Sequence, residues 1–185
     1  MFGWLKRTEV QWSPEIRGVI TEHGKPVAGL KVTRTLDYDN KVVNDHVVTD
    51  HEGRFSFARK TKKIHRVLFD STIGLFLSVA DYPTPGQELY FFDIRSLNDL
   101  NGQALDLIMS DMHCELTAEE KNFSLKNLET PEGVAPWLSA RCTFTHASTA
   151  LYSDDELELQ RQEREHELDE QERLEQARIR NEQGK

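Results

Sequence analysis

Short segments in which apolar and polar residues alternate dominate most of the chain, and turn residues separate them. In one such segment Ile73, Leu75 and Leu77 occupy every second position. Alternation puts every second side chain on the same face of an extended strand, so each strand has one apolar face that another layer must cover. Residues 8–146 therefore predict a mainly β, antiparallel fold of about seven short strands, arranged as a sandwich or a small barrel.

The turn residues set the expected strand bounds. HGKP at 23–26 predicts a hairpin between the strands 16–21 and 30–36, and DHEG at 50–53 predicts the turn that sends Phe55 and Phe57 into the core. The prolines of DYPTPG end a strand, because proline donates no hydrogen bond to a ladder. The expected strands are 16–21, 30–36, 43–49, 54–57, 73–79, 89–95 and 105–110, with turns at 38–40 and 81–86 and a closing strand or edge at 137–146.

Two stretches match the capping box, in which a hydroxyl and a carboxylate satisfy the first free amides of a helix. TAEE at 117–120 predicts a short helix, and SDDE at 153–156 predicts a helix that continues along the tail. The residues from Ser153 onward contribute 12 acidic and 6 basic side chains, a net −6 of the chain's −9. Their leucines are too sparse for a regular coiled coil, which favours a solvated, partly frayed helix over a partner-binding or self-associating one. The expected organisation is a sandwich over 1–117, an extension packed on it over 118–152, and a charged helical or partly disordered tail over 153–185.

Composition excludes several protein classes. No apolar run approaches the roughly 20 residues that cross a bilayer, and the first residues do not read as a secretory signal, so the expected location is the cytoplasm. An acidic chain is repelled by phosphates, which disfavours nucleic acid as a partner. Cys114 and Cys142 lack the spacing of a zinc or redox motif, and both follow or lie in expected strands. They are a candidate structural pair, although free thiols are favoured in a reducing cytosol.

Residues 18–60 resemble a known family. The GKPVAG turn at 24–29, the next strand with its Arg-Thr, and TDHEGRFSF at 49–57 resemble the opening of the transthyretin-like (prealbumin-like), carboxypeptidase-regulatory-like β-sandwich domain. LNGQALDL at 100–107 and HCELTAEE at 113–120 resemble a group of small, uncharacterised bacterial proteins that carry this domain. The resemblance implies a binding or spacer module without catalytic residues or cofactor. It also implies another protein as the partner, such as a cognate toxin or a secretion component, and hence an immunity protein or adaptor.

Enzymatic alternatives rest on the histidines. The 5-hydroxyisourate hydrolases, which share the transthyretin fold, have a C-terminal Tyr-Arg-Gly-Ser motif that this chain lacks. No HxH or HExxH spacing occurs, so no metal site is expected. The alternative is a small hydrolase or metal-dependent enzyme, which requires histidines from separate loops to converge in one pocket. The histidines are His23, His46, His51, His65, His113, His146 and His166.

One basic segment opposes the acidic character of the whole chain. Arg59, Lys60, Lys62, Lys63 and Arg66 lie within eight positions. They are candidates for contact with an anion or a partner: a phosphate, a lipid headgroup or the acidic tail. A hairpin tip that needs solubility explains the segment equally well.

Overall fold

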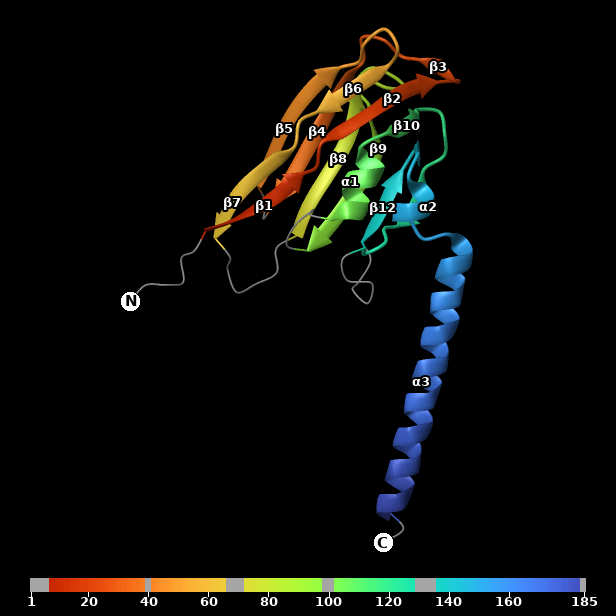
Figure 1. Cartoon of the computed structure of the whole chain (residues 1–185). Helices are drawn as coiled ribbons and strands as arrows, with labels where there is room; N and C mark the ends of the chain where they lie inside the picture. Colours follow the sequence, from red (N-terminus) through yellow and green to blue (C-terminus); the bar gives the residue numbers. More distant parts are fainter. Residues whose placement is uncertain (1–6, 39–40, 66–71, 98–101, 129–135, 184–185) are drawn as a thin grey trace, which may run out of the picture. The chain divides into compact units, whose positions relative to one another are not determined.

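The computed structural model describes residues 7–38, 41–65, 72–97, 102–128 and 136–183 (Figure 1). The chain divides into two compact units, Met1–Leu151 and Tyr152–Lys185. The first unit is a β-sandwich and the second is one long helix, so the fold is mainly β with a charged C-terminal helix. None of the described helices is long and apolar enough to span a membrane.

The larger layer of the sandwich is a six-stranded sheet in which all neighbours are antiparallel. Its central strands β8 and β9 are the expected strands 73–79 and 89–95, and β4 and β5 form the expected hairpin around 38–40. The strand order is β11 (Lys121–Ser124), β12 (Trp137–Ala140), β9 (Glu88–Leu97), β8 (Thr72–Ala80), β4 (Lys31–Tyr38) and β5 (Lys41–Val48).

The second layer is a five-stranded sheet centred on β2. On one side β2 pairs in parallel with β10, and on the other it pairs antiparallel with β3 and β6. On the other side of Pro14 the pairing continues into a ribbon of two further strands. Ile16 pairs with Phe57 and Ser13 with Lys60, and the register of the ribbon then shifts by one residue between Ser13 and Gln11. The strands are β13 (Cys142–Phe144), β10 (Met112–Glu115), β2 (Ile16–Glu22), β3 (Lys25–Pro26) and β6 (Arg54–Phe57), and the ribbon is β1 (Arg7–Ser13) with β7 (Lys60–His65).

Aromatic rings join the two layers across the core. Phe55 of β6 packs edge-on against Phe91 of β9, and Phe144 of β13 packs against Phe92. Both Phe91 and Phe92 are buried because the ladder between β8 and β9 shifts register at this point, and such a bulge turns two successive side chains to the same face. Gly53 (φ 73°) makes the expected turn before Phe55, and a Cβ there would lie 2.5 Å from the carbonyl oxygen of Ile20.

Several local predictions were wrong. The strands 16–21 and 30–36 do not form a hairpin: β2 and β4 lie in different sheets, and the turn at 23–26 joins β2 only to the short β3. The expected strand 105–110 is the helix α1 (Gln103–Met109), in which Leu105, Ile108 and Met109 are buried at helical spacing. The closing segment 137–146 divides into β12 and β13, one in each sheet, followed by the short helix α2 (Ala147–Ala150).

The two expected capping boxes had different outcomes. At the tail the box forms: the amide of Ser153 donates to Glu156 Oε2 (2.7 Å), and the amide of Glu156 donates to Ser153 Oγ (3.2 Å). The helix α3 (Asp154–Gln183) follows it for 30 residues. The helix expected after Thr117 was wrong, because Thr117 donates both its amide and its hydroxyl backward to Glu115, and the chain continues as β11.

Candidate protein-binding surface

The outer face of the six-stranded sheet carries exposed aromatic residues. On β8 the residues Ile73, Leu75, Leu77 and Val79 are fully buried, so Phe76 between them points to the outer face. The bulge on β9 leaves Tyr90 outward, with 45% of its surface exposed. On β12 Trp137 is 63% exposed. We call Phe76, Tyr90, Asp93, Arg95 and Trp137 the aromatic face.

Phe76 is held in place from three sides. A Cβ at Gly74 would lie 2.7 Å from the Phe76 ring, so the ring rests directly on the glycine backbone. The guanidinium of Arg95 lies 5.0 Å from the ring centroid, and the ring of Tyr90 stands edge-on at 6.3 Å. A cation over an aromatic ring and an edge-to-face ring pair both have favourable geometry. Phe76 is therefore packed before any partner arrives.

Glu88 fixes the orientation of Tyr90. The Ser78 hydroxyl donates to Glu88 Oε1 at 2.6 Å, and the Tyr90 hydroxyl donates to Oε2 at 3.2 Å. Burial, followed by the nearby Glu88 carboxylate, raises the pKa of Tyr90. The phenol thus stays protonated and remains a hydrogen-bond donor.

Trp137 of β12 and Arg95 of β9 lie beside each other on adjacent strands. Leu138 pairs with Ile94, so the preceding Trp137 and the following Arg95 occupy neighbouring positions on adjacent antiparallel strands. Asp93 lies two residues from Arg95 on the same face; burial, and to a lesser degree Glu120, raises the pKa of Asp93, which Arg95 opposes. Tryptophan, tyrosine and arginine are the residues that dominate the binding energy of protein interfaces.

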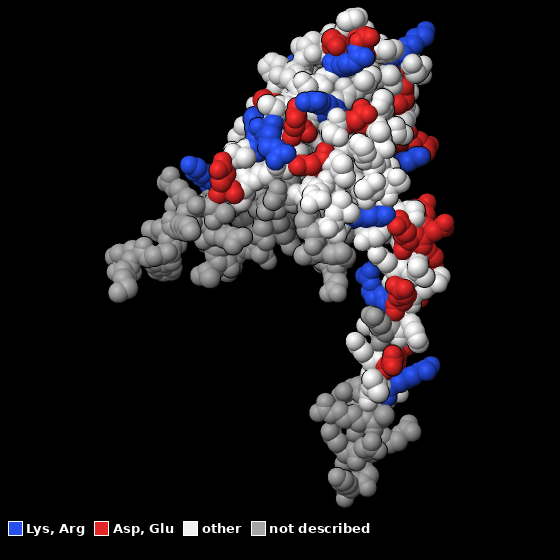
Figure 2. All heavy atoms as spheres, viewed as in Figure 1, with Lys and Arg blue, Asp and Glu red and all other residues white. Residues whose placement is uncertain are grey.

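The five-stranded sheet has a different outer surface. A shallow groove of about 740 Å³ runs over this surface to the end of β5, lined by Arg17, Val19 and Arg54 and by Val48 of β5, among others. The two arginines are paired with acids on the same surface, Arg17 with Glu15 at 2.6 Å and Arg54 with Glu52. Figure 2 shows acidic and basic side chains interspersed over the face of the sandwich that is turned to the viewer. This surface is polar and its charges are largely neutralised.

The basic segment does not form one anion site. Arg59 pairs with Asp106 (2.9 Å), and Lys60 pairs with Asp45 (2.7 Å). Lys62 lies over the rings of Trp12 (3.8 Å) and Tyr38 (5.1 Å). Lys63 is exposed on β7, and Arg66 lies outside the described residues.

A buried arginine connects the ribbon to the six-stranded sheet. Arg34 on β4 is 1% exposed, and its guanidinium donates to both oxygens of Asp45, at 2.9 and 2.7 Å. It also donates to the hydroxyl of Ser13 (3.0 Å) and the carbonyl of Ala58 (2.8 Å) and lies over the ring of Phe57. Burial acts to raise the pKa of Asp45, but hydrogen bonds and charge from Arg34 and Lys60 outweigh it and lower that pKa.

A disulfide joins two short neighbouring strands of the five-stranded sheet. Cys114 of β10 and Cys142 of β13 are directly opposite in the antiparallel pair and are bonded to each other. The prediction that free thiols are favoured was therefore wrong, because the two cysteines form a disulfide. The sequence separation of the two cysteines does not predict this contact. Arg141, between β12 and β13, connects the two sheets: its amide donates to the carbonyl of Phe91 in one sheet, and its carbonyl accepts from the amide of Glu115 in the other. The chain thereby returns to β10.

Glu115, next to this disulfide, receives hydrogen bonds from two separate loops. The amides of His23 and Gly24 and the hydroxyl of Thr21 each donate to its carboxylate at 2.9 Å, and the amide of Thr117 donates at 3.1 Å. Burial acts to raise the pKa of Glu115, but the hydroxyl and amide of Thr117, the amide of Gly24 and the hydroxyl of Thr21 lower it to about 2. The carboxylate ties β10 to the turn between β2 and β3.

Replacing Glu115 with glutamine is expected to destabilise the protein in a pH-dependent way. The folded-state pKa of about 2 lies below the ordinary value of 4.5, so the carboxylate contributes stability above about pH 4.5 and loses it as the pH falls toward 2. At neutral pH, Glu115→Gln should lower the free energy of unfolding by about 1.5–3 kcal/mol, the value of hydrogen bonds to a charged acceptor. Urea unfolding at a series of pH values should show the difference shrinking below pH 4.5; a constant difference would contradict this role.

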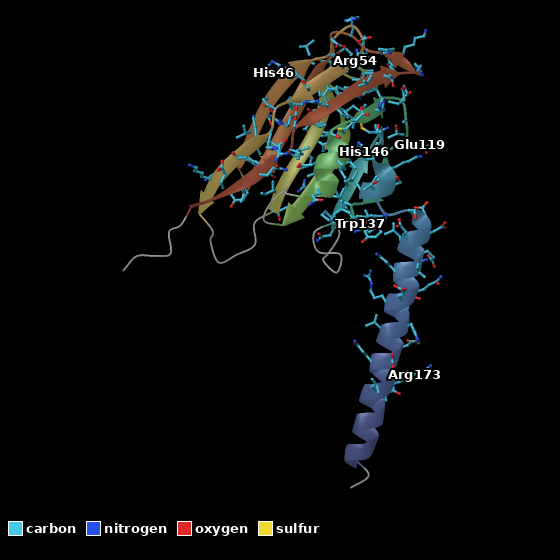
Figure 3. All side chains as sticks on the ribbon, viewed as in Figure 1. His46, Arg54, Glu119, Trp137, His146 and Arg173 are labelled. Atoms are coloured by element: carbon cyan, nitrogen blue, oxygen red, sulfur yellow. A yellow bond between two sulfur atoms is a disulfide. The ribbon has the colours of Figure 1, made fainter. Side chains whose placement is uncertain are left out.

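The structure places the described histidines on separate elements. Figure 3 shows His46 on β5 and His146 at the start of α2. His51 lies in the turn before β6. His23 lies in the turn after β2, and His113 on β10 faces Asp111 at 3.4 Å. Among the residues that the structure describes, no three histidine, cysteine or acidic side chains are arranged to hold a metal ion.

Sequence reasoning missed the aromatic face. One feature of the sequence indicates this face: Phe76 lies between Leu75 and Leu77, so an aromatic residue occupies the outward position of an alternating strand. Tyr90 gives no such signal, because the bulge that turns it outward depends on the pairing of β9 with β8.

Comparison with known proteins identifies one family. No curated protein and no solved structure matches the chain significantly. Residues 16–119, more than half of the chain, match a family described as a domain of unknown function, which covers the strands from β2 to β10. The chain therefore belongs to the DUF6795 family.

Proposed function

We propose that this protein is a non-enzymatic protein-binding module that contacts its partner through the aromatic face. The observation that carries the proposal is the exposure of Trp137 and Tyr90 beside Arg95 on one open sheet surface. Large aromatic side chains fixed before binding lose little conformational entropy in a complex, so they contribute strongly to affinity. The contacts of Phe76 with Gly74 and Tyr90, and of the Tyr90 hydroxyl with Glu88, provide that rigidity for Phe76 and Tyr90.

The partner that we propose is a protein such as a cognate toxin or a secretion component, which makes this chain an immunity protein or adaptor in a bacterium. The support is the resemblance of residues 18–60 to the transthyretin-like sandwich, together with the net charge of −9, which attracts a basic partner. A cytoplasmic location stays a prediction. The Cys114–Cys142 bond favours an oxidising compartment, and the bonded fraction of the protein in its own cells distinguishes the two.

Trp137→Ala is expected to weaken partner binding by about thirtyfold or more, because loss of a central aromatic residue costs about 2 kcal/mol or more. The wild-type chain is first used to isolate the partner from its native host, and the affinity of each purified variant for that partner is then measured by calorimetry. Leu168→Ala is the matched control, since this leucine of α3 is 59% exposed and lies outside the aromatic face.

The same measurement tests the competing surface. Arg54→Ala alters the groove of the five-stranded sheet and should leave the affinity within about twofold, the usual effect of an exposed ion pair. If Arg54→Ala abolishes binding while Trp137→Ala has no effect, the groove and not the aromatic face is the binding surface.

A further inference from the structure

The strand β5 ends the six-stranded sheet with an open edge. It is eight residues long and is paired with β4, and in the described part of the chain no strand pairs with its other side. The amide of Thr49, directly after β5, donates to the carbonyl of Leu30 at 3.0 Å. Because backbone groups alternate in direction along a strand, the odd-numbered residues of β5 face β4 and the even-numbered ones face the open edge. The outward amides are those of Val42, Asn44, His46 and Val48.

Most of β5 lacks the features that usually protect an edge strand, and its one lysine, Lys41, lies at the first position, outside the four outward residues. Proteins commonly protect edge strands with proline, with a bulge or with an unpaired charge. The strand has no proline, its register with β4 is continuous, and its central charge, Asp45, is neutralised by Arg34 and Lys60. Val42 is 58% and Val48 60% exposed at its two ends. The edge is therefore available for pairing.

The order of residues along this edge makes it complementary to itself. Read in either direction, the outward positions are valine, polar, polar, valine. If two copies pair antiparallel about a two-fold axis at Asp45, Val42 lies opposite Val48 of the second copy and Asn44 lies opposite His46. Every outward amide and carbonyl then finds a partner, and both valine pairs are apolar. Each Asp45 keeps its own two cations, so no bare like-charge pair results.

We propose that two copies of this chain associate through β5, joining their six-stranded sheets into one continuous sheet. A two-fold axis perpendicular to the sheet keeps the same face outward in both copies. The dimer therefore carries two aromatic faces on one side, so it would bind a repeated or dimeric partner at two points. Figure 3 shows His46 on β5 and Trp137 on β12, which lie toward opposite edges of the sheet. The dimer does not depend on the function proposed above.

The test uses charge substitutions at the pair Asn44 and His46, neither of which belongs to the aromatic face or lines the groove of the five-stranded sheet. Sedimentation equilibrium of the full-length chain over a wide concentration range should show a reversible dimer. Asn44→Lys alone and His46→Glu alone should each weaken dimerisation about tenfold, because each places two like charges close together across the axis. An equimolar mixture of the two variants should associate more tightly than either alone, because the lysine introduced in one copy then lies opposite the glutamate introduced in the other.

Asn122→Lys is the matched control. It makes the same change on β11, the opposite edge strand of the same sheet, and should leave dimerisation unchanged. Three results would overturn the proposal: a wild-type chain that stays monomeric, a mixture that associates no better than its components, or a dimer that tolerates Asn44→Lys. The last result would place the contact elsewhere, for example on α3.

Discussion

Arg34→Ala should lower the free energy of unfolding by about 3–5 kcal/mol, because it removes the buried partner of an ion pair and leaves Asp45 with Lys60 alone. The guanidinium donates to Asp45, Ser13 and Ala58, so its loss also frees a buried hydroxyl and a backbone carbonyl. Ser13 belongs to the ribbon, Asp45 to β5 and Ala58 to the segment between β6 and β7, so Arg34 connects all three, and Lys60 of the ribbon adds a second contact to Asp45. Urea unfolding monitored by tryptophan fluorescence measures the change.

Two further substitutions separate this mechanism from a general loss of charge. Arg34→Lys should recover little stability, since an ammonium cannot donate to both oxygens of Asp45 and still reach Ser13 and Ala58. Arg54→Ala, at an arginine that is exposed and paired with Glu52, should cost less than about 1 kcal/mol. Equal losses for Arg34→Ala and Arg54→Ala would show that burial of the guanidinium contributes nothing.

The sequence contained a sign of this arginine. Val32, Arg34 and Leu36 all occupy the inward register of β4, in the strand expected over 30–36, where the alternation depends on the apolar residues. A charged residue at an inward position implies a buried partner, but the partner, Asp45, is visible only once β4 and β5 are paired. The inward position of Arg34 could therefore be predicted from the sequence, but the hydrogen bonds that it makes in the folded protein could not.

Alternation predicted strands well where one face is buried and the other exposed, as at Phe55 and Phe57 or along β8. It failed where the same spacing fits two structures. Leu105, Leu107 and Met109 alternate, yet Leu105, Ile108 and Met109 form the buried stripe of α1. It also cannot show which sheet a strand joins, because β2 and β4 are close in sequence but lie in different layers. The aromatic face depends on that assembly and so was not predictable.

Removing the Cys114–Cys142 bond should lower the free energy of unfolding by about 3–4 kcal/mol. The bond closes a segment with a sequence separation of 28, and by the chain-entropy argument a loop of this length restricts the unfolded chain by about that amount. Both sulfurs are buried, and β13 has only three residues of its own to pair with β10. The bond is therefore a main attachment of β13 to its sheet.

Two preparations of the full-length protein, oxidised and reduced, should be unfolded in urea side by side, with Cys114→Ala/Cys142→Ala as a variant that cannot form the bond. The reduced protein and the double variant should be destabilised by similar amounts, because both release the same loop. In hydrogen exchange, the amides of β13 and of α2 should lose protection first, before those of β8 and β9 in the central sheet. If reduction leaves β13 as protected as β8, the backbone pairing with β10 and the Glu115 network hold the strand by themselves, and the disulfide only restricts the unfolded chain.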